Sequence, residues 1–394
     1  RVMLTKDDWN ARLSSPVDFP CPSYADEATP EFFTNVLRRC GTIGADILVE
    51  GVDLVRAGQQ GLLSEVVFFS LRYSKDPGGA PTELAGKFLP RQSAMPKESL
   101  AMGFANERIF HKEFPHGKVV KTPLVYFCED AVIIMEKMPV APFDLFAETP
   151  GETVQSILNT LARMHARLWG GPVTKGGPHS VGESLMSRLD IADLLGTMLD
   201  QEGLEAVERL YPEAKTLLPG LPTTLPPLAA HVVKDLCYKK EDPMTLIWGD
   251  IKVDNIFDLG GEDRDRFRFI DFAGGGWAPP SDDTSFFLVV TLTPPEYQTH
   301  WEAYLREYHA TLTSEGVTLD WEQCRQAHIH KVFMLLVSCC ILAKKREATV
   351  RDHPELMSTA DWAREVRLCD RLMSHTYRAL HYHDALALLN TVGK

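Results

Sequence analysis

The sequence lacks the patterns that mark a metal cluster, a disulfide framework or a membrane span. Its eight cysteines include no CxxC pair and lie at irregular intervals in apolar segments, which predicts buried thiols in a reducing compartment. No apolar run approaches the roughly 18 residues that span a bilayer. The longest, Val332 to Ala343, predicts a buried helix, and residues 1–10 show no signal-peptide pattern. We therefore expect a cytoplasmic protein with no membrane span.

Positive charge is also scarce. The chain has 41 Lys and Arg against 54 Asp and Glu, a formal net charge of -13. A nucleic-acid surface needs a basic stripe, so we expect no nucleic-acid partner. No internal repeat or low-complexity tail is present. The 394 residues are enough for one large two-lobed unit or two domains.

The N-terminal third changes from a helical to a strand pattern. Residues 1–46 predict a helical extension, in which Thr29 caps a helix that begins at Pro30. Residues 47–138 then predict a small β-rich lobe with one inserted helix at 99–113. Its expected strands are 47–55, 65–73, 82–89, 119–126 and 131–136.

A glycine-containing turn lies between the first two of these strands. Gly58, Gly61 and Ser64 belong to it. Glycines at such a junction let backbone N–H groups approach a phosphate closely. An ordinary hairpin turn would look the same, so this turn alone is weak evidence for a nucleotide site.

Lys87 is an isolated charge within the third predicted strand. Such a lysine often lies at an exposed edge, but in a phosphotransfer enzyme it reaches the α- and β-phosphates and pairs with a helix carboxylate. Glu107, in the inserted helix, is the first candidate partner and Glu98 the second. A helix glutamate is more often simply solvated, so the pairing depends on the surrounding pattern.

The β-rich lobe ends at a proline-rich hinge. We assign Glu136 and Met138, at this point, to nucleotide binding. Residues 139–394 predict a large α-helical lobe. Within it, Thr149 to Glu152 has the spacing of a capping box at the start of a helix, as does Thr293 to Glu296.

The strongest chemical pattern lies at 246–272. Asp250 and Asp271 stand 21 positions apart, each beside a short apolar run, and Asn255 follows the first of them by five residues. This is the layout of a magnesium–ATP phosphotransfer centre, in which one Asp meets the acceptor hydroxyl while Asn and the second Asp hold the metal. The order of glycine turn, strand lysine, helix glutamate, hinge and acidic hairpin predicts an α+β, two-lobed protein-kinase-like fold.

Four segments carry a resemblance to a known superfamily. They are 248–255 (WGDIKVDN), 270–272 (IDF), 161–169 (LARMHARLW) and 280–288 (PSDDTSFFL). They resemble signatures of the aminoglycoside phosphotransferase-like kinases, most closely the choline-kinase-like and ecdysteroid-kinase-like branch. The resemblance covers roughly residues 29 to 350, and the two Asp motifs are its specific part.

The resemblance implies an enzyme that uses ATP and Mg²⁺ to phosphorylate a hydroxyl of a small-molecule acceptor. Asp250 would orient the hydroxyl and accept its proton, and Lys252 would neutralise charge on the phosphoryl group in transit, as in protein kinases. Asn255 and Asp271 would ligate Mg²⁺. Lys87 would hold the α- and β-phosphates, which the 58–64 turn would cover.

Two positions depart from the family pattern. Trp248 replaces a histidine before Gly-Asp, and Ala273 follows Asp271-Phe272 where Gln or Gly is frequent. We interpret both as altered packing, with a nucleotide-binding pseudokinase as the alternative. Protein kinase activity is disfavoured because no Ala-Pro-Glu segment follows Asp271.

The sequence leaves the oligomeric state open and does not identify the acceptor. Amino alcohols, aminoglycosides and sterol-like alcohols remain alternatives, as do ATP and GTP as donors.

Overall fold

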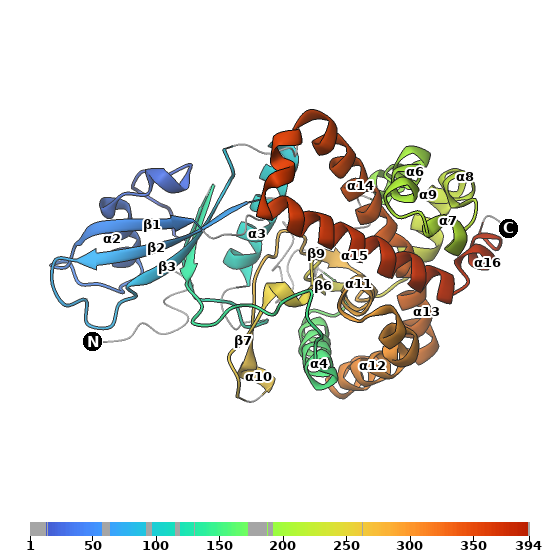
Figure 1. Cartoon of the computed structure of the whole chain (residues 1–394). Helices are drawn as coiled ribbons and strands as arrows, with labels where there is room; N and C mark the ends of the chain where they lie inside the picture. Colours follow the sequence, from blue (N-terminus) through green and yellow to red (C-terminus); the bar gives the residue numbers. More distant parts are fainter. Residues whose placement is uncertain are drawn as a thin grey trace. The chain divides into compact units, whose positions relative to one another are not determined.

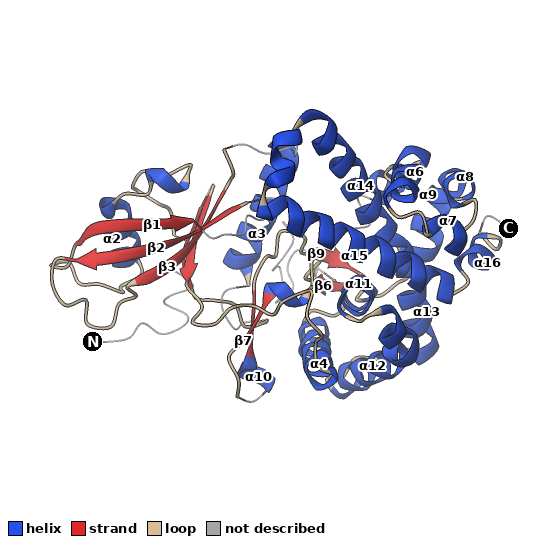
Figure 2. Ribbon diagram, viewed as in Figure 1, coloured by secondary structure: helices blue, strands red, loops and turns tan. Residues whose placement is uncertain are grey.

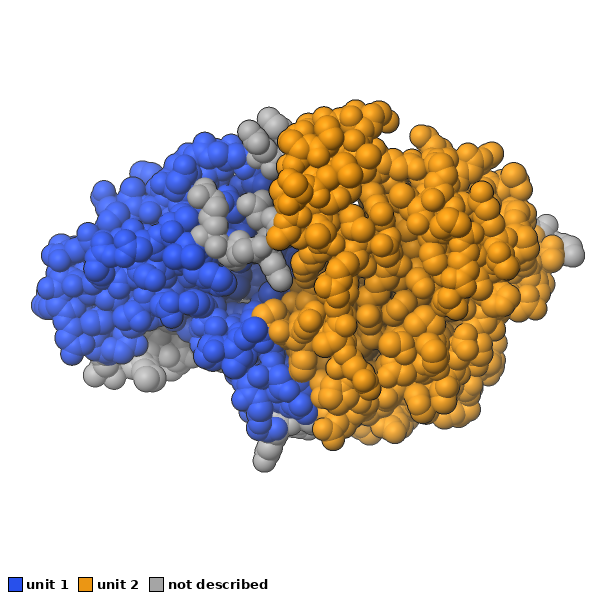
Figure 3. Space-filling model, viewed as in Figure 1, with its two compact units in different colours: residues 1–141, 257–274 blue, residues 142–256, 275–394 orange. Residues whose placement is uncertain are grey.

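The computed structural model describes residues 13, 15–56, 64–91, 97–114, 119–129, 131–171, 187, 192–261 and 263–392. The chain divides into two compact units (Figure 3). Unit 1 comprises residues 1–141 and 257–274, and unit 2 comprises residues 142–256 and 275–394. Most strands belong to unit 1, whereas unit 2 is mainly helical (Figure 2).

Unit 1 contains the larger sheet, the helices beside it and the hairpin of the second acidic motif (Figure 1). Its first elements are η1 (Ala25–Glu27), α2 (Pro30–Arg39), β1 (Val49–Arg56), β2 (Glu65–Tyr73), β3 (Glu83–Phe88), α3 (Lys97–Glu113), β4 (Val125–Glu129) and β5 (Val132–Glu136). The hairpin consists of β7 (Ile256–Asp258), which begins at the boundary of unit 2, α10 (Asp263–Arg266) and β8 (Phe267–Phe269).

The five-stranded sheet has the order β1-β2-β3-β5-β4 and is antiparallel throughout. This confirms the predicted sheet with one inserted helix. The prediction was wrong in detail at the fourth strand, because residues 119–124 are not in a strand. Cys128 and Glu129, which lie between the predicted strands 119–126 and 131–136, extend β4 instead. Proline at 123 explains part of the shift, since it cannot donate a ladder hydrogen bond.

The main core of unit 1 lies between α2 and the sheet. Thr29 caps α2 as predicted, its hydroxyl oxygen accepting the Phe32 N–H at 3.2 Å. The apolar face of α2 then places Phe33 4.8 Å from the ring of Phe69 in β2, centroid to centroid. Lys87 in β3 is buried in this unit as well, and Ile133 of β5 is its register partner.

Unit 2 is built from helices around two short strands, β6 (Thr245–Ile247) and β9 (Gly276–Ala278), which pair antiparallel. The first helices are α4 (Gly151–Arg167), α5 (Ala192–Thr197), α6 (Gln201–Leu210), α7 (Ala214–Leu217), α8 (Leu221–Thr224), η2 (Pro226–Leu228), α9 (Ala229–His231), the π-helix η3 (Val232–Cys237) and η4 (Val253–Asn255). The later ones are α11 (Ser281–Thr291), α12 (Pro294–Ser314), α13 (Trp321–Lys331), η5 (Val332–Met334), α14 (Leu335–Asp352), η6 (Pro354–Ser358), α15 (Ala360–Tyr382) and α16 (Ala385–Leu389).

The two predicted capping boxes of unit 2 have different outcomes. At α12, Thr293 and Glu296 form the box, with the Thr293 N–H donating to Glu296 Oε2 at 2.8 Å. At α4 the prediction was wrong. Pro150 is the N-cap there, and its carbonyl oxygen accepts the N–H groups of Thr153 and Val154, so the Thr149 side chain makes no cap.

One continuous helical run in unit 2, Trp321–Asp352, is long and apolar enough to cross a bilayer by length and composition. Most of its apolar window is buried within the protein. It therefore forms part of the core of unit 2, as the sequence predicts for Val332 to Ala343. All eight cysteines are free, and seven of them are buried.

Candidate functional site

Lys87 lies in a buried group of charges in unit 1. Its ammonium group donates to Glu107 Oε2 and, at 2.8 Å, to Asp271 Oδ1. The side chain of Glu107 is 1% exposed and that of Asp271 is 30% exposed. The structure thus brings together three predicted site residues that come from β3, α3 and the segment after β8. Glu107, the first candidate, is the helix partner.

The two carboxylates control the charge of the lysine. Burial alone would lower the pKa of Lys87, but the charges and hydrogen bonds of Asp271 and Glu107 outweigh it and raise the pKa above its ordinary value. Lys87 therefore stays protonated at neutral pH. One ammonium group is thus shared by two carboxylates, of which that of Asp271 is the more exposed.

One face of α3 holds the acidic motif 271–273 in place. Asn106 donates to the carbonyl oxygen of Ala273 at 3.0 Å. One turn further along, Phe110 stacks on Phe272 with ring centroids 3.6 Å apart. The contact with Ala273 uses only its backbone oxygen, so the unusual alanine does not remove it.

Asp271 itself adopts a left-handed backbone conformation, with φ at +65°. Apart from Gly, this region is populated mainly by Asn and Asp. Residues in sparsely populated backbone regions persist where the surrounding structure fixes them, and they cluster at functional sites. Here the stacked Phe272 and the ion pair with Lys87 supply that fixation.

The other residues predicted to bind nucleotide are less informative. Gly58 and Gly61 lie outside the described residues. Ser64 is buried just before β2. Glu136 ends β5, and its carboxylate accepts the N–H of Leu124, the residue before β4, at 3.2 Å. Met138 follows β5 and is half-buried.

The catalytic-loop residues predicted from sequence come together in unit 2. Lys252 Nζ donates to Asp250 Oδ2. The amide nitrogen of Asn255 donates to the backbone oxygen of Asp250 at 2.9 Å and to its Oδ2 at 3.2 Å. This use of the Asn255 nitrogen leaves the amide oxygen as the atom that could coordinate a cation.

A buried carboxylate fixes the start of this loop. Asp283, fully buried in α11, accepts the Trp248 N–H at 2.7 Å and the Gly249 N–H at 2.8 Å. Gly249 has φ at +83°, which its lack of a Cβ permits. Because the contact at position 248 is made by the backbone, Trp248 can replace a histidine there and pack its own ring in the core.

Behind Asp283 lies a hydrogen-bonded chain of buried side chains. His165 Nε2 is 3.1 Å from Asp283 Oδ2, and His165 Nδ1 is 2.7 Å from the hydroxyl of Tyr308. In the tautomer with the ring proton on Nε2, His165 donates to Asp283 and its Nδ1 accepts from the Tyr308 hydroxyl. Burial, with smaller effects of Cys324 and Asp283, raises the pKa of Tyr308 well above 10 and keeps it a donor.

In the sequence, Asp283 stands at the acidic position of the 280–288 segment that resembles the family, but the sequence predicts no role for it. The available signal was an acidic side chain beside the long apolar run of α11, where a carboxylate needs donors. Its backbone donors lie 34 and 35 positions away in sequence, and no spacing rule could identify them.

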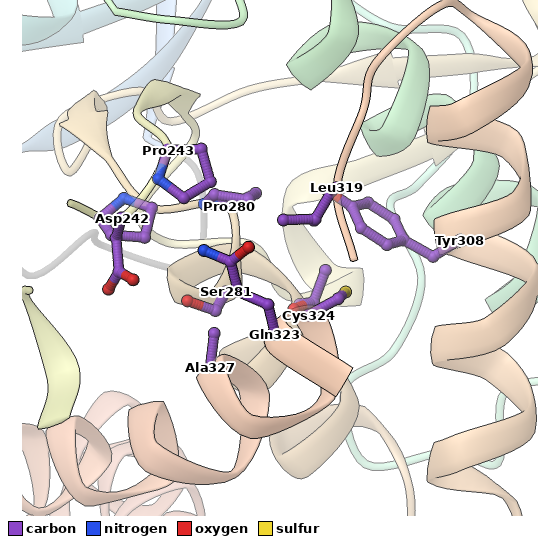
Figure 4. A pocket seen from close by; sticks show the side chains of 11 residues that line it. Asp242, Pro243, Pro280, Ser281, Tyr308, Leu319, Gln323, Cys324 and Ala327 are labelled. Atoms are coloured by element: carbon purple, nitrogen blue, oxygen red, sulfur yellow. The ribbon is translucent and has the colours of Figure 1, made fainter. Parts of the chain in front are cut away.

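A small pocket in unit 2 is lined in part by Tyr308, the last member of this series of hydrogen-bonded side chains. Figure 4 shows it with Tyr308, Leu319 and Cys324 among its lining side chains. None of the predicted site residues lines it. The pocket is therefore separate from the loop that carries Asp250.

The donor chemistry of the predicted metal ligands fits Mg²⁺. Asn255 and Asp271 offer oxygen atoms, which this hard cation prefers. Within the described ranges, no three His, Cys, Asp or Glu side chains form a cluster able to hold a metal by themselves. Mg²⁺ in kinases is commonly held by one or two such side chains together with substrate phosphates.

The fold and the two motifs place the protein in the class of small-molecule kinases with a protein-kinase-like fold. The structure is similar to choline kinase from Cryptosporidium parvum Iowa II, with a TM-score of 0.51, 9% identity, and coverage of 92% of this chain and 97% of that chain. An ethanolamine kinase of Plasmodium vivax gives a TM-score of 0.47 at 13% identity, covering 87% of each chain. At such identities the likeness concerns the fold alone.

A match in sequence shows the family to which the chain belongs. The model of the ecdysteroid kinase-like family matches residues 107–320, more than half of the chain. The protein therefore belongs to the ecdysteroid kinase-like family, and the resemblance predicted from the motifs is confirmed. No curated protein matches the chain in sequence.

Proposed function

We propose that the protein transfers the γ-phosphoryl group of ATP, in a Mg²⁺-dependent reaction, to a hydroxyl of a small-molecule acceptor. The observation that carries the proposal is the loop in which Asp250, Lys252 and Asn255 contact one another. Asp283 fixes the start of this loop through two backbone hydrogen bonds. Such a fixed acidic loop suits catalysis that depends on positioning.

In this proposal Asp250 accepts the proton of the acceptor hydroxyl. The acceptor oxygen then forms a bond to the γ-phosphorus while the bond from that phosphorus to the β,γ-bridging oxygen breaks. The products are a phosphate monoester and ADP. Lys252, whose ammonium group already lies against Asp250, would neutralise negative charge on the phosphoryl group during transfer.

Residues of unit 1 would bind the nucleotide. Lys87, kept in place by Glu107, would contact the α- and β-phosphates, and backbone groups of Gly58, Gly61 and Ser64 would cover them. Glu136 and Met138 would lie near the nucleotide at the hinge. We propose residues 47–138 as the nucleotide-binding lobe, 139–394 as the lobe with the acceptor pocket, and 1–46 as an extension.

Asn255 and Asp271 would hold Mg²⁺, which when bound offsets the negative charge of the phosphates. The 30% exposure of the Asp271 side chain supports this assignment, since a cation can reach a carboxylate oxygen there.

The test is phosphotransfer from radiolabelled ATP to a panel of amino alcohols, aminoglycosides and sterols, with and without Mg²⁺. In the Asp250→Asn variant we expect kcat to fall by about 10² to 10⁴, the usual contribution of a general base, while binding of the nucleotide persists. Glu241→Gln, which alters an exposed carboxylate before β6, is the matched control and should keep full activity. Unchanged turnover in Asp250→Asn would refute the assignment.

The second candidate is a nucleotide-binding pseudokinase, favoured by Trp248 and Ala273. It predicts that ATP raises the melting temperature while no acceptor is phosphorylated and no ATP is hydrolysed. Slow Mg²⁺-dependent hydrolysis that disappears in Asp271→Asn would exclude it.

A further inference from the structure

The helix α15 presents a row of basic side chains on one face. Arg364, Arg367, Arg371 and His375 follow one another at intervals of three, four and four residues, which places them on the same side of a helix. Arg364 contacts Asp254, and the guanidinium carbon of Arg367 lies 4.0 Å from the centre of the Phe146 ring. The row therefore touches the catalytic loop at one end.

The other end of the row caps α11. Arg371 donates to the backbone oxygens of Val290 and Thr291 at 2.9 and 2.8 Å, and His375 lies 2.9 Å from the backbone oxygen of Val289. These are terminal carbonyl groups of α11, which lack partners within their own helix. Because α11 carries Asp283, α15 supports the same loop by a second route.

The contact of Arg364 with the loop is partly buried. Its Nη2 lies 2.5 Å from Oδ2 of Asp254, whose side chain is only 8% exposed. The second oxygen of Asp254 is buried and has no hydrogen-bond partner within the described residues. Arg364 is thus the ion-pair partner of a carboxylate that directly precedes Asn255.

From this geometry we infer that Arg364 is a positioning residue for the metal side of the loop. Asp283 fixes the loop at positions 248 and 249, and Arg364 fixes it at position 254. Asn255 lies between Asp254 and β7, so the orientation of its amide oxygen depends on the second of these contacts. The inference rests on the proposed function, in which that oxygen ligates Mg²⁺.

A purely structural role makes a different prediction. If Arg364 only compensates the buried charge of Asp254, removing both charges should restore both the melting temperature and the response to Mg²⁺ that are lost when Arg364 alone is replaced. If Arg364 positions Asn255, the double variant recovers stability but keeps a weakened response to Mg²⁺. Four variants separate these cases: Arg364→Met, Arg364→Lys, Asp254→Asn, and Arg364→Met with Asp254→Asn. Arg367→Met, on the same helix face but away from the loop, is the matched control.

The measurements are the melting temperature without ligand and the Mg²⁺ concentration that gives half of the thermal stabilisation by ATP. We expect this concentration to rise about tenfold to a hundredfold in Arg364→Met and in the double variant, the range found when groups that orient a metal ligand are lost. Arg364→Lys should recover part of the effect and Arg367→Met should resemble the wild type. Where turnover is measurable, KM for the acceptor should stay unchanged.

Two results would overturn the inference. One is a double variant with the Mg²⁺ response of the wild type, and the other is an Arg364→Met variant that loses melting temperature only. A wild-type protein that binds Mg²⁺–ATP but phosphorylates no acceptor would refute the proposed kinase activity. The Mg²⁺ dependence of thermal stabilisation could still be measured in it and would still test the role of Arg364. A wild-type protein that binds no nucleotide would overturn both.

Discussion

Replacing Asp283 by Asn is the sharpest test of how the proposed catalytic loop, residues 248–255, is fixed. The substitution keeps the shape of the side chain and removes one acceptor. Oδ2 accepts from Trp248 N–H and faces His165 Nε2, while Oδ1 accepts from Gly249 N–H. In the better orientation the amide oxygen takes the place of Oδ2, and the new NH₂ group then faces the N–H of Gly249.

The expected loss of stability follows from the missing acceptor for the Gly249 N–H. A hydrogen bond to a charged group contributes about 1.5–3 kcal/mol, and a buried donor left without an acceptor costs a similar amount. We expect the free energy of unfolding of Asp283→Asn to fall by about 3–4 kcal/mol. Displacement of the loop should also lower kcat by about tenfold to a hundredfold, because small misplacements of reacting groups are costly.

Urea unfolding followed by tryptophan fluorescence measures the first effect, and the phosphotransfer assay measures the second. Tyr308→Phe is the control, because it removes only the hydrogen bond between the Tyr308 hydroxyl and His165, which does not involve the loop. It should cost about 1 kcal/mol and leave kcat nearly unchanged. If Asp283→Asn is as stable and as active as the wild type, or if Tyr308→Phe loses as much kcat, the proposed fixation of the loop is wrong.

Two further predictions concern buried charge. Lys87→Met should lower the free energy of unfolding by about 3–5 kcal/mol in urea titration, because Glu107 loses its cation. Adding Glu107→Gln should recover much of that loss without restoring ATP binding, and recovery of both would contradict the assigned role of Lys87. The second concerns pH. Burial, helped by Arg371 and Arg325 respectively, lowers the pKa of His375 and His383 to about 4 from 6.5. The unfolded chain then binds more protons between these values, so stability that is complete above pH 6.5 should decline as the pH falls towards 4, by at most about 3 kcal/mol for each histidine. A melting temperature that is flat from pH 7 to 4 would contradict this.

The features predictable from sequence are those with a local cause. Strand patterning predicts β2 with its observed bounds, and a threonine followed by proline predicts the start of α2. In both cases a short stretch of residues contains the physical reason. The ion pair of Lys87 with Glu107 is different, because it is predicted from the order of motifs along much of the chain.

The features that could not be predicted depend on pairs far apart in sequence. Periodicity shows that α15 has a polar face, but it does not show that Arg364 meets Asp254, 110 positions earlier. The hydrogen bonds of Asp283 likewise involve backbone groups, which every residue type carries and which leave no mark on composition. Such contacts follow only from the packing of complete helices.

The backbone contacts at Trp248 and Ala273 have a consequence for how relatives of this protein are found. At both positions the atom that matters is a main-chain N–H or C=O, which substitution leaves in place. A search that demands histidine before Gly-Asp, or Gln or Gly after Asp-Phe, would reject chains that keep these contacts. An aspartate that accepts from the loop backbone, as Asp283 does here, is a feature that such a search could use in addition to the residues that flank the motif.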